Sequence, residues 1–186
     1  MALTYTHAPR PTAGPVTFTL AGDRLTVDSG RTVQEVRLGA VDLVRLTYEP
    51  RSLARAAFRT RLRLGDGRSF AFSSLSWRSM IDAEERAVEY RAFTRALLDA
   101  VAQANPQARF LAGRPQAIWA AFAALSAAAL FGIALFVWRA VAAGATGAAL
   151  LGGLVLALGI WQLEPVVRLN RPRRFRPDAP PAGLLP

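Results

Sequence analysis

Two long uncharged stretches near the C-terminal end constrain this 186-residue chain more than any other feature. Residues 117–138 (AIWAAFAALSAAALFGIALFVW) carry no charge. A helix of that length is about 33 Å long, against about 30 Å for the hydrocarbon core of a bilayer. The second stretch begins between Val141 and Gly147 and ends at Leu163, and its shortest version still reaches the lower limit of about 17 residues for a spanning helix. The sequence therefore predicts transmembrane helices over 117–138 and about 143–163.

The alternative is a pair of buried core helices in a soluble protein. A core helix of this length normally carries a polar stripe, and neither stretch has one. Trp119, Trp138 and Trp161 fall near the predicted helix ends, where an indole ring prefers the headgroup region of a bilayer. We therefore expect a membrane hairpin with these tryptophans at its borders.

Small residues recur on the second predicted helix at the spacing that lets helix backbones approach closely in lipid. They are Gly144, Ala148, Gly152 and Gly159. The other interpretation is that Ala and Gly only fill apolar helices in an Ala-rich chain.

Arg139 is the one ionisable residue in 117–163, whereas conduits and pumps normally need several such groups. The predicted hairpin is therefore an anchor or a docking surface.

Arginines concentrate on the outer flanks of this hairpin, and the positive-inside rule then places both termini in the cytoplasm. The first 15 residues show no apolar signal-peptide core, which agrees with this orientation. The prediction is a multi-pass protein of the cell (inner) membrane whose flanking arginines meet anionic lipid headgroups. The arginines after the second helix are Arg168, Arg171, Arg173, Arg174 and Arg176.

The preceding part of the chain is rich in predicted strands. Residues 16–74 alternate apolar and polar side chains between turn signals, and Asp66-Gly67 is typical of a tight hairpin turn. Asp82 and Glu85 have the spacing of a capping box, so a helix is predicted from there to Asn105, ahead of a proline. Strands followed by one amphipathic helix predict an α+β domain.

The predicted organisation has five parts. It comprises a flexible N-terminus (1–15), a β-rich domain that ends in an amphipathic helix (16–106), a linker (107–116), an all-α transmembrane hairpin (117–163) and a basic, Pro-rich cytoplasmic tail (164–186).

The segment VRLGAVDLVRLTYE (36–49), an LxLxDGxxxxF hairpin and the closing helix together resemble bacterial pleckstrin-homology-like (PH-like) domains. The resemblance covers residues 16–105. It implies a partly open antiparallel β-barrel with a C-terminal helix, acting as a binding or assembly module with no catalytic residues and no cofactor. The hairpin pattern consists of Leu62, Leu64, Asp66 and Gly67 with Phe70 or Phe72.

The residues offer little for catalysis or metal binding. Cysteine is absent and His7 is the only histidine, in a Pro-rich stretch that we expect to be disordered. We expect no enzyme activity, metal, cofactor or small-molecule substrate. Nucleic acid is also not expected, because no aromatic residues interleave a basic groove.

The most distinctive feature of the β-rich domain is Arg59, Arg61 and Arg63, which alternate with uncharged residues and so share one strand face. This face either contacts anionic lipid headgroups or is an ordinary solvated face in an Arg-biased chain. Four further arginines could extend the patch: Arg45, Arg51, Arg55 and Arg68.

Two functions follow as hypotheses. The first is a membrane-anchored, non-catalytic interaction or assembly module. The second is an accessory subunit that docks to a larger membrane complex through its hairpin. Partners would be anionic lipids, a membrane protein or a second copy of the chain.

Overall fold

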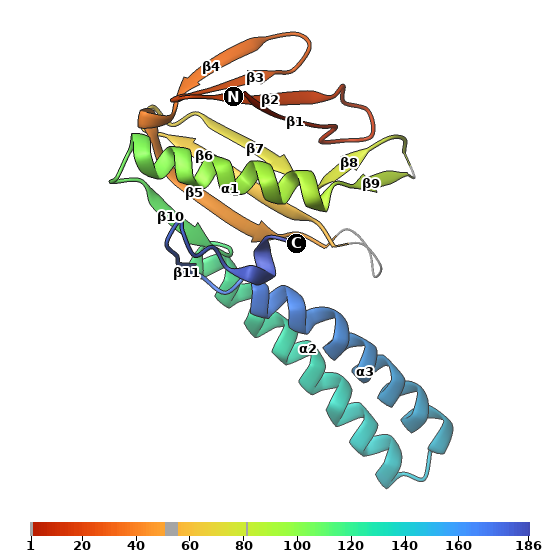
Figure 1. The fold of residues 1–186 in the computed structure, drawn as a ribbon. Helices are drawn as coiled ribbons and strands as arrows, with labels where there is room; N and C mark the ends of the chain where they lie inside the picture. Colours follow the sequence, from red (N-terminus) through yellow and green to blue (C-terminus); the bar gives the residue numbers. More distant parts are fainter. Residues whose placement is uncertain (1, 51–55, 81) are drawn as a thin grey trace. The chain divides into compact units, whose positions relative to one another are not determined.

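The computed structural model describes residues 2–50, 56–80 and 82–186, which form two compact units (Figure 1). The first, called here the sheet unit, consists of Met1–Gly113 together with Arg173–Pro186. The second, the hairpin unit, is Arg114–Pro172. The hairpin unit is therefore inserted into the sequence of the sheet unit. The predicted α+β class, with strands first and long apolar helices later, is confirmed.

The sheet unit begins with four antiparallel strands in sequence order. In the first three strands buried residues alternate with partly exposed ones, as in β2, where Phe18 and Leu20 face the core, and the fourth strand buries Val36 alone. The period of two therefore assigns one apolar face to each strand. The strands are β1 (Leu3–His7), β2 (Val16–Ala21), β3 (Arg24–Asp28) and β4 (Val33–Arg37).

A short 3-10 helix, η1 (Leu38–Ala40), leads into a five-stranded sheet of order β11-β10-β5-β6-β7. All neighbours in it are antiparallel except β10 and β5, which are parallel. A separate two-stranded ribbon pairs β8 with β9. The bounds are β5 (Val41–Tyr48), β6 (Phe58–Leu64), β7 (Ser69–Ser73), β8 (Leu75–Trp77), β9 (Ala83–Glu85), β10 (Arg109–Ala112) and β11 (Arg173–Arg174).

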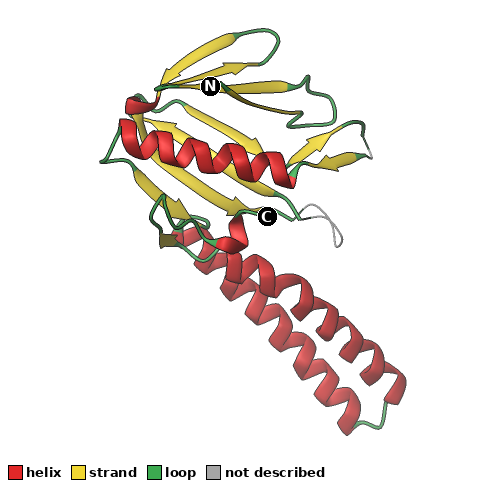
Figure 2. Ribbon diagram, viewed as in Figure 1, coloured by secondary structure: helices red, strands yellow, loops and turns green. Residues whose placement is uncertain are grey.

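Helix α1 (Ala87–Ala104) lies over one face of the five-stranded sheet (Figure 2). The hydroxyls of Tyr90 and Thr60 are 2.7 Å apart, which joins the helix to β6 by a buried hydrogen bond. The predicted capping box at Asp82 and Glu85 is wrong. Residues 83–85 form β9, so their backbone hydrogen bonds go to β8, and the helix starts only after Arg86.

The core beneath α1 is an aromatic cluster. Phe72 lies at its centre, with ring centroids 5.2 Å from Phe18, 5.3 Å from Phe93 and 5.6 Å from Tyr5. These rings come from both sheets and from α1, so their contacts hold the three layers together.

The predicted flexible N-terminus (1–15) is wrong for Leu3–His7, which forms β1 and pairs with β2 along its whole length. Tyr5 is 2% exposed, and its hydroxyl donates a hydrogen bond to the carbonyl of Ser73 at 2.6 Å. His7 is also 2% exposed, beside Tyr5 and Phe18. The Pro-rich stretch that suggested disorder is the loop between β1 and β2.

The predicted linker (107–116) and tail (164–186) need correction too. The linker contains β10, which adds to the sheet through backbone pairs with β5. The tail contains the last part of α3, β11 and a second 3-10 helix, η2 (Ala182–Leu184), which lies against β5. Leu184 is fully buried and Leu185 is 6% exposed. Residues after the hairpin therefore complete the core of the sheet unit.

The hairpin unit consists of α2 (Gln116–Ala142) and α3 (Thr146–Leu169), joined by a three-residue turn. Both helices are long and apolar enough to cross a membrane, and only 6% of the most apolar window of each is buried. Core helices of a soluble protein would be mostly buried. The helices are longer than predicted, because α2 includes Arg139 and α3 continues past Glu164 to Leu169.

Burial of His7 makes the stability of the sheet unit dependent on pH. Loss of water, and secondarily the charges of Arg59 and Arg86, lower the pKa of His7 from 6.5 to about 4. Since the unfolded chain binds a proton that the folded chain excludes, this stabilisation is complete above pH 6.5 and is lost as the pH falls towards 4. Between pH 7.5 and 5 the free energy of unfolding should fall by about 2 kcal/mol. Urea unfolding of the chain in detergent, followed by circular dichroism, measures this. His7→Phe should remove most of that slope, and an unchanged slope in the variant would contradict the assignment.

Candidate functional site

The arginines of β6 lie on the face of the five-stranded sheet that is turned away from the core. Along this strand Thr60, Leu62 and Leu64 are buried, whereas Arg61 and Arg63 are exposed and Arg59 is half-buried. Successive side chains of a strand point to opposite faces of the sheet, so the three guanidinium groups share one face.

Strand β5 places another arginine among them. Arg45 lies directly opposite Arg61 in the antiparallel register, and its guanidinium donates a hydrogen bond to the carbonyl of Gly113 at 2.9 Å. Partial burial, and then repulsion from Arg61 and Arg63, lower the pKa of Arg45 below its ordinary value. Like charges directly opposite each other destabilise a sheet, so this arrangement costs stability unless an anion is present.

Counter-charges are sparse on this face. Glu49 accepts a hydrogen bond from Arg59 at 3.3 Å, and Arg61 and Arg63 have no ion pair within the described residues. Arg68 instead pairs with Asp66 at 2.7 Å in the β6–β7 turn, so it is already neutralised. Arg51 and Arg55, which were predicted to extend the patch, lie outside the described residues.

A polar pocket of 500 Å³ opens next to the same patch. Arg59 and Trp77 line it together with Arg10 from the β1–β2 loop. This pocket could not be predicted from the sequence, because its residues come from three segments that are distant in sequence. The remaining lining residues are Pro9, Pro11 and Ala13.

In the hairpin unit, two of the predicted small residues lie at the contact between the helices. A Cβ added to Gly152 would be 2.8 Å from Cγ2 of Val137, and one added to Gly159 would be 3.1 Å from Cδ2 of Leu130. Gly144 belongs to the turn, where its φ of 70° favours glycine, and Ala148 is exposed. Gly152 and Gly159 are therefore the residues that permit close approach.

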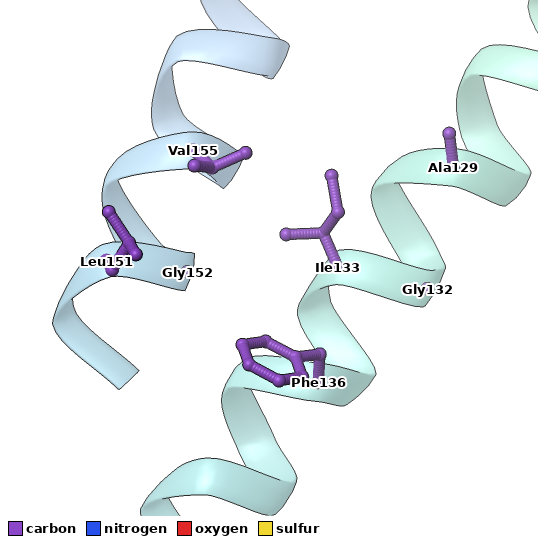
Figure 3. A pocket seen from close by; sticks show the side chains of 7 residues that line it. All are labelled: Ala129, Gly132, Ile133, Phe136, Leu151, Gly152 and Val155. Carbon is purple, nitrogen blue, oxygen red and sulfur yellow. The ribbon is translucent and has the colours of Figure 1, made fainter. Parts of the chain in front are cut away.

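An apolar groove of 410 Å³ runs beside Gly152 (Figure 3). Ile133 and Phe136 of α2 extend toward α3, and Gly132 and Gly152 leave the space open. The groove has almost no polar surface, so it suits an apolar occupant such as an acyl chain or another helix. It is also lined by Ala129, Leu151 and Val155.

The three tryptophans differ in their surroundings. Trp138 and Trp161 are each 62% exposed. The indole N–H of Trp119 instead donates to the carbonyl of Val167 at 2.8 Å and so satisfies one of the unpaired carbonyls at the end of α3. Because α3 runs to Leu169, Trp161 lies about two turns before its end, one turn ahead of the Glu164–Arg168 ion pair.

The arginines after the predicted hairpin do not form a single tail. Arg168 is in the last turn of α3, Arg173 and Arg174 form β11, and Arg176 forms an isolated bridge with Ala179. Arg171 lies between α3 and β11.

No cluster of three or more potential metal ligands occurs among the residues that the structure describes. A scan against protein-family models and a search of curated proteins gave no match.

The contact at Gly152 gives a matched test. Gly152→Leu should force α2 and α3 apart, because its Cβ alone would meet Val137 and Phe136. Gly153→Leu should be tolerated, since no atom lies within 4 Å of a Cβ at that position. A thermal melt of the purified chain in detergent should show a lower midpoint for Gly152→Leu only. Equal midpoints for the two variants would show that the glycine is not a packing residue.

Proposed function

We propose that this chain is a membrane-anchored, non-catalytic interaction or assembly module. The observation that carries the proposal is that the apolar hairpin interrupts the sheet unit between two strands, β10 and β11, which pair with each other. The chain thus leaves and rejoins the sheet unit at adjacent points. Such an insertion suits a tether that holds a folded domain at a bilayer.

The fold of the sheet unit supports a PH-like assignment. Four antiparallel strands, then a second antiparallel group of β5, β6 and β7, then α1 follow the order expected of a partly open barrel with a closing helix. Domains of this kind usually bind partners and do not catalyse reactions. Strands β10 and β11 extend the five-stranded sheet beyond β5 and flank the hairpin unit in sequence.

We further propose that both flanks of the hairpin face the cytoplasm at the bacterial inner membrane. Residues on both flanks belong to one folded unit, so both must lie on the same side of a bilayer. The flanking arginines, Arg109 and Arg114 before the hairpin and Arg168 to Arg176 after it, then select the cytoplasmic side.

Cysteine labelling tests this orientation, since the chain has no native cysteine. Val33→Cys, at a side chain that is 67% exposed in the sheet unit, should resist an impermeant maleimide in intact cells. Ala143→Cys, in the turn between α2 and α3, should react. Both should react in lysed cells. Reaction at Val33→Cys without reaction at Ala143→Cys in intact cells would reverse the proposed topology.

A second function has one observation in its favour. The groove beside Gly152 offers an apolar surface on the hairpin itself, as in an accessory subunit that docks to a larger membrane complex (Figure 3).

Affinity purification in a gentle detergent separates the two functions. The comparison is between the native chain and a chain whose residues 116–169 are exchanged for an unrelated two-helix hairpin of equal length. We expect the same partner protein or anionic lipid to co-purify with both, because the sheet unit would carry the binding. Loss of the partner from the exchanged chain and from Gly152→Leu, but not from Gly153→Leu, would favour the accessory subunit. Recovery of both chains alone and monomeric, without bound anionic lipid, would contradict both functions.

A further inference from the structure

The arginines of β6 belong to a larger arrangement that spans four strands of the five-stranded sheet. The registers align Arg174 of β11 with Leu111 of β10, Leu111 with Arg45 of β5, and Arg45 with Arg61 of β6. Paired positions in a sheet carry their side chains on the same face. Arg174, which follows the hairpin in sequence, therefore shares a face with arginines that precede it.

A neighbouring row repeats the pattern. Arg109 of β10 aligns with Leu43 of β5, and Leu43 aligns with Arg63 of β6. Arg59 lies four residues before Arg63 on the same strand face. The patch measures about 14 Å across the four strands and about 13 Å along β6. We call it the basic sheet face, made up of Arg45, Arg59, Arg61, Arg63, Arg109 and Arg174.

The charge of this face is hardly compensated. Glu49, paired with Arg59, is the one carboxylate in an ion pair with these arginines among the described residues. The remaining positions, 1, 51–55 and 81, contain no acidic residue. Arg45 and Arg61 also stand directly opposite each other, a pairing that an anion would relieve.

We propose that the basic sheet face docks onto anionic phospholipid headgroups of the leaflet next to the hairpin. The inference rests on the proposed function, and it names the partner of the sheet unit. Guanidinium groups bind phosphate oxygens in a bidentate manner, which suits arginine for such a surface.

Chain length keeps this face close to the bilayer. Arg174 is five residues beyond Leu169, the end of α3, and Arg109 is seven residues before Gln116, the start of α2. Fully extended, these segments span at most about 18 Å and about 25 Å. These short segments therefore keep the basic sheet face within reach of the lipid headgroups, whose local concentration is high.

The uncharged positions of the face favour lipid over nucleic acid. The uncharged residues that align with the arginines are Leu43, Leu111, Thr47, Ala71, Ser69 and Ser73. None is aromatic, whereas single-stranded nucleic acid is bound through stacking on aromatic rings. The registers place arginines from four neighbouring strands on one face, which lets several guanidinium groups meet the phosphates of a membrane surface.

The test uses the full chain in nanodiscs of phosphatidylcholine, with or without phosphatidylglycerol. A fluorophore on Ala71→Cys reports from the basic sheet face, since Ala71 aligns with Arg61, and a headgroup-linked quencher lipid reports proximity. Quenching should increase with phosphatidylglycerol and decrease with added salt, because ions screen such contacts.

Arg61→Gln combined with Arg63→Gln should reduce the docked-to-undocked ratio about 30-fold. The matched control is Arg31→Gln with Arg37→Gln, which removes the same charge at exposed positions before and on β4 of the other sheet. The control should quench like the parent. Circular dichroism checks that all variants are folded.

Two results would overturn the proposal. One is quenching of the parent that does not depend on phosphatidylglycerol. The other is an equal loss in the variant and its control, which would reduce the effect to net charge. If the chain is nevertheless stably incorporated in the discs, either result contradicts only the docking and not the proposed membrane-anchored module. A chain that fails to incorporate in the discs would contradict the membrane-anchored module itself.

Discussion

The parallel pairing of β10 with β5 is the interaction through which the residues after the hairpin join the sheet unit. After β7 the chain forms the β8–β9 ribbon, passes over the sheet as α1 and returns alongside β5, because parallel strands require a long crossover. β10 then offers its other edge to β11, and the N–H of Phe175 donates to the carbonyl of Phe110 at 3.2 Å. Without β10, the segment after the hairpin would have no strand to pair with.

This arrangement explains how a short C-terminal segment is held. Burial of Leu184 and Leu185 contributes about 1.5–3 kcal/mol for each side chain, and Arg91 of α1 hydrogen-bonds to Pro186. The segment also brings Arg174 to the basic sheet face. The segment after the hairpin thus contributes apolar side chains to the core on one face of the sheet and an arginine to the basic face on the other.

Elements with local signals could be predicted from the sequence, and elements with long-range pairings could not. Apolar runs predicted α2 and α3, and alternation with the Asp66-Gly67 turn predicted β6 and β7, because their patterns lie within one segment. β10 and β11 are four and two residues long, too short for a periodic pattern, and their partners are distant in sequence. The alternation of Arg59, Arg61 and Arg63 predicted a basic strand face, but its extension to Arg109 and Arg174 needed the register across four strands.

The central claim is that residues before and after the hairpin form one sheet. A cross-linking measurement tests it most directly, in a chain that has no native cysteine and carries a protease site inserted in the turn between α2 and α3. Leu111→Cys and Arg174→Cys occupy paired positions of β10 and β11, so oxidation should join them and the cleaved halves should migrate together until reduced. The pair Leu111→Cys and Asp178→Cys serves as the control and should separate. Separation of the halves for the first pair, under conditions where the chain is folded, would contradict the account.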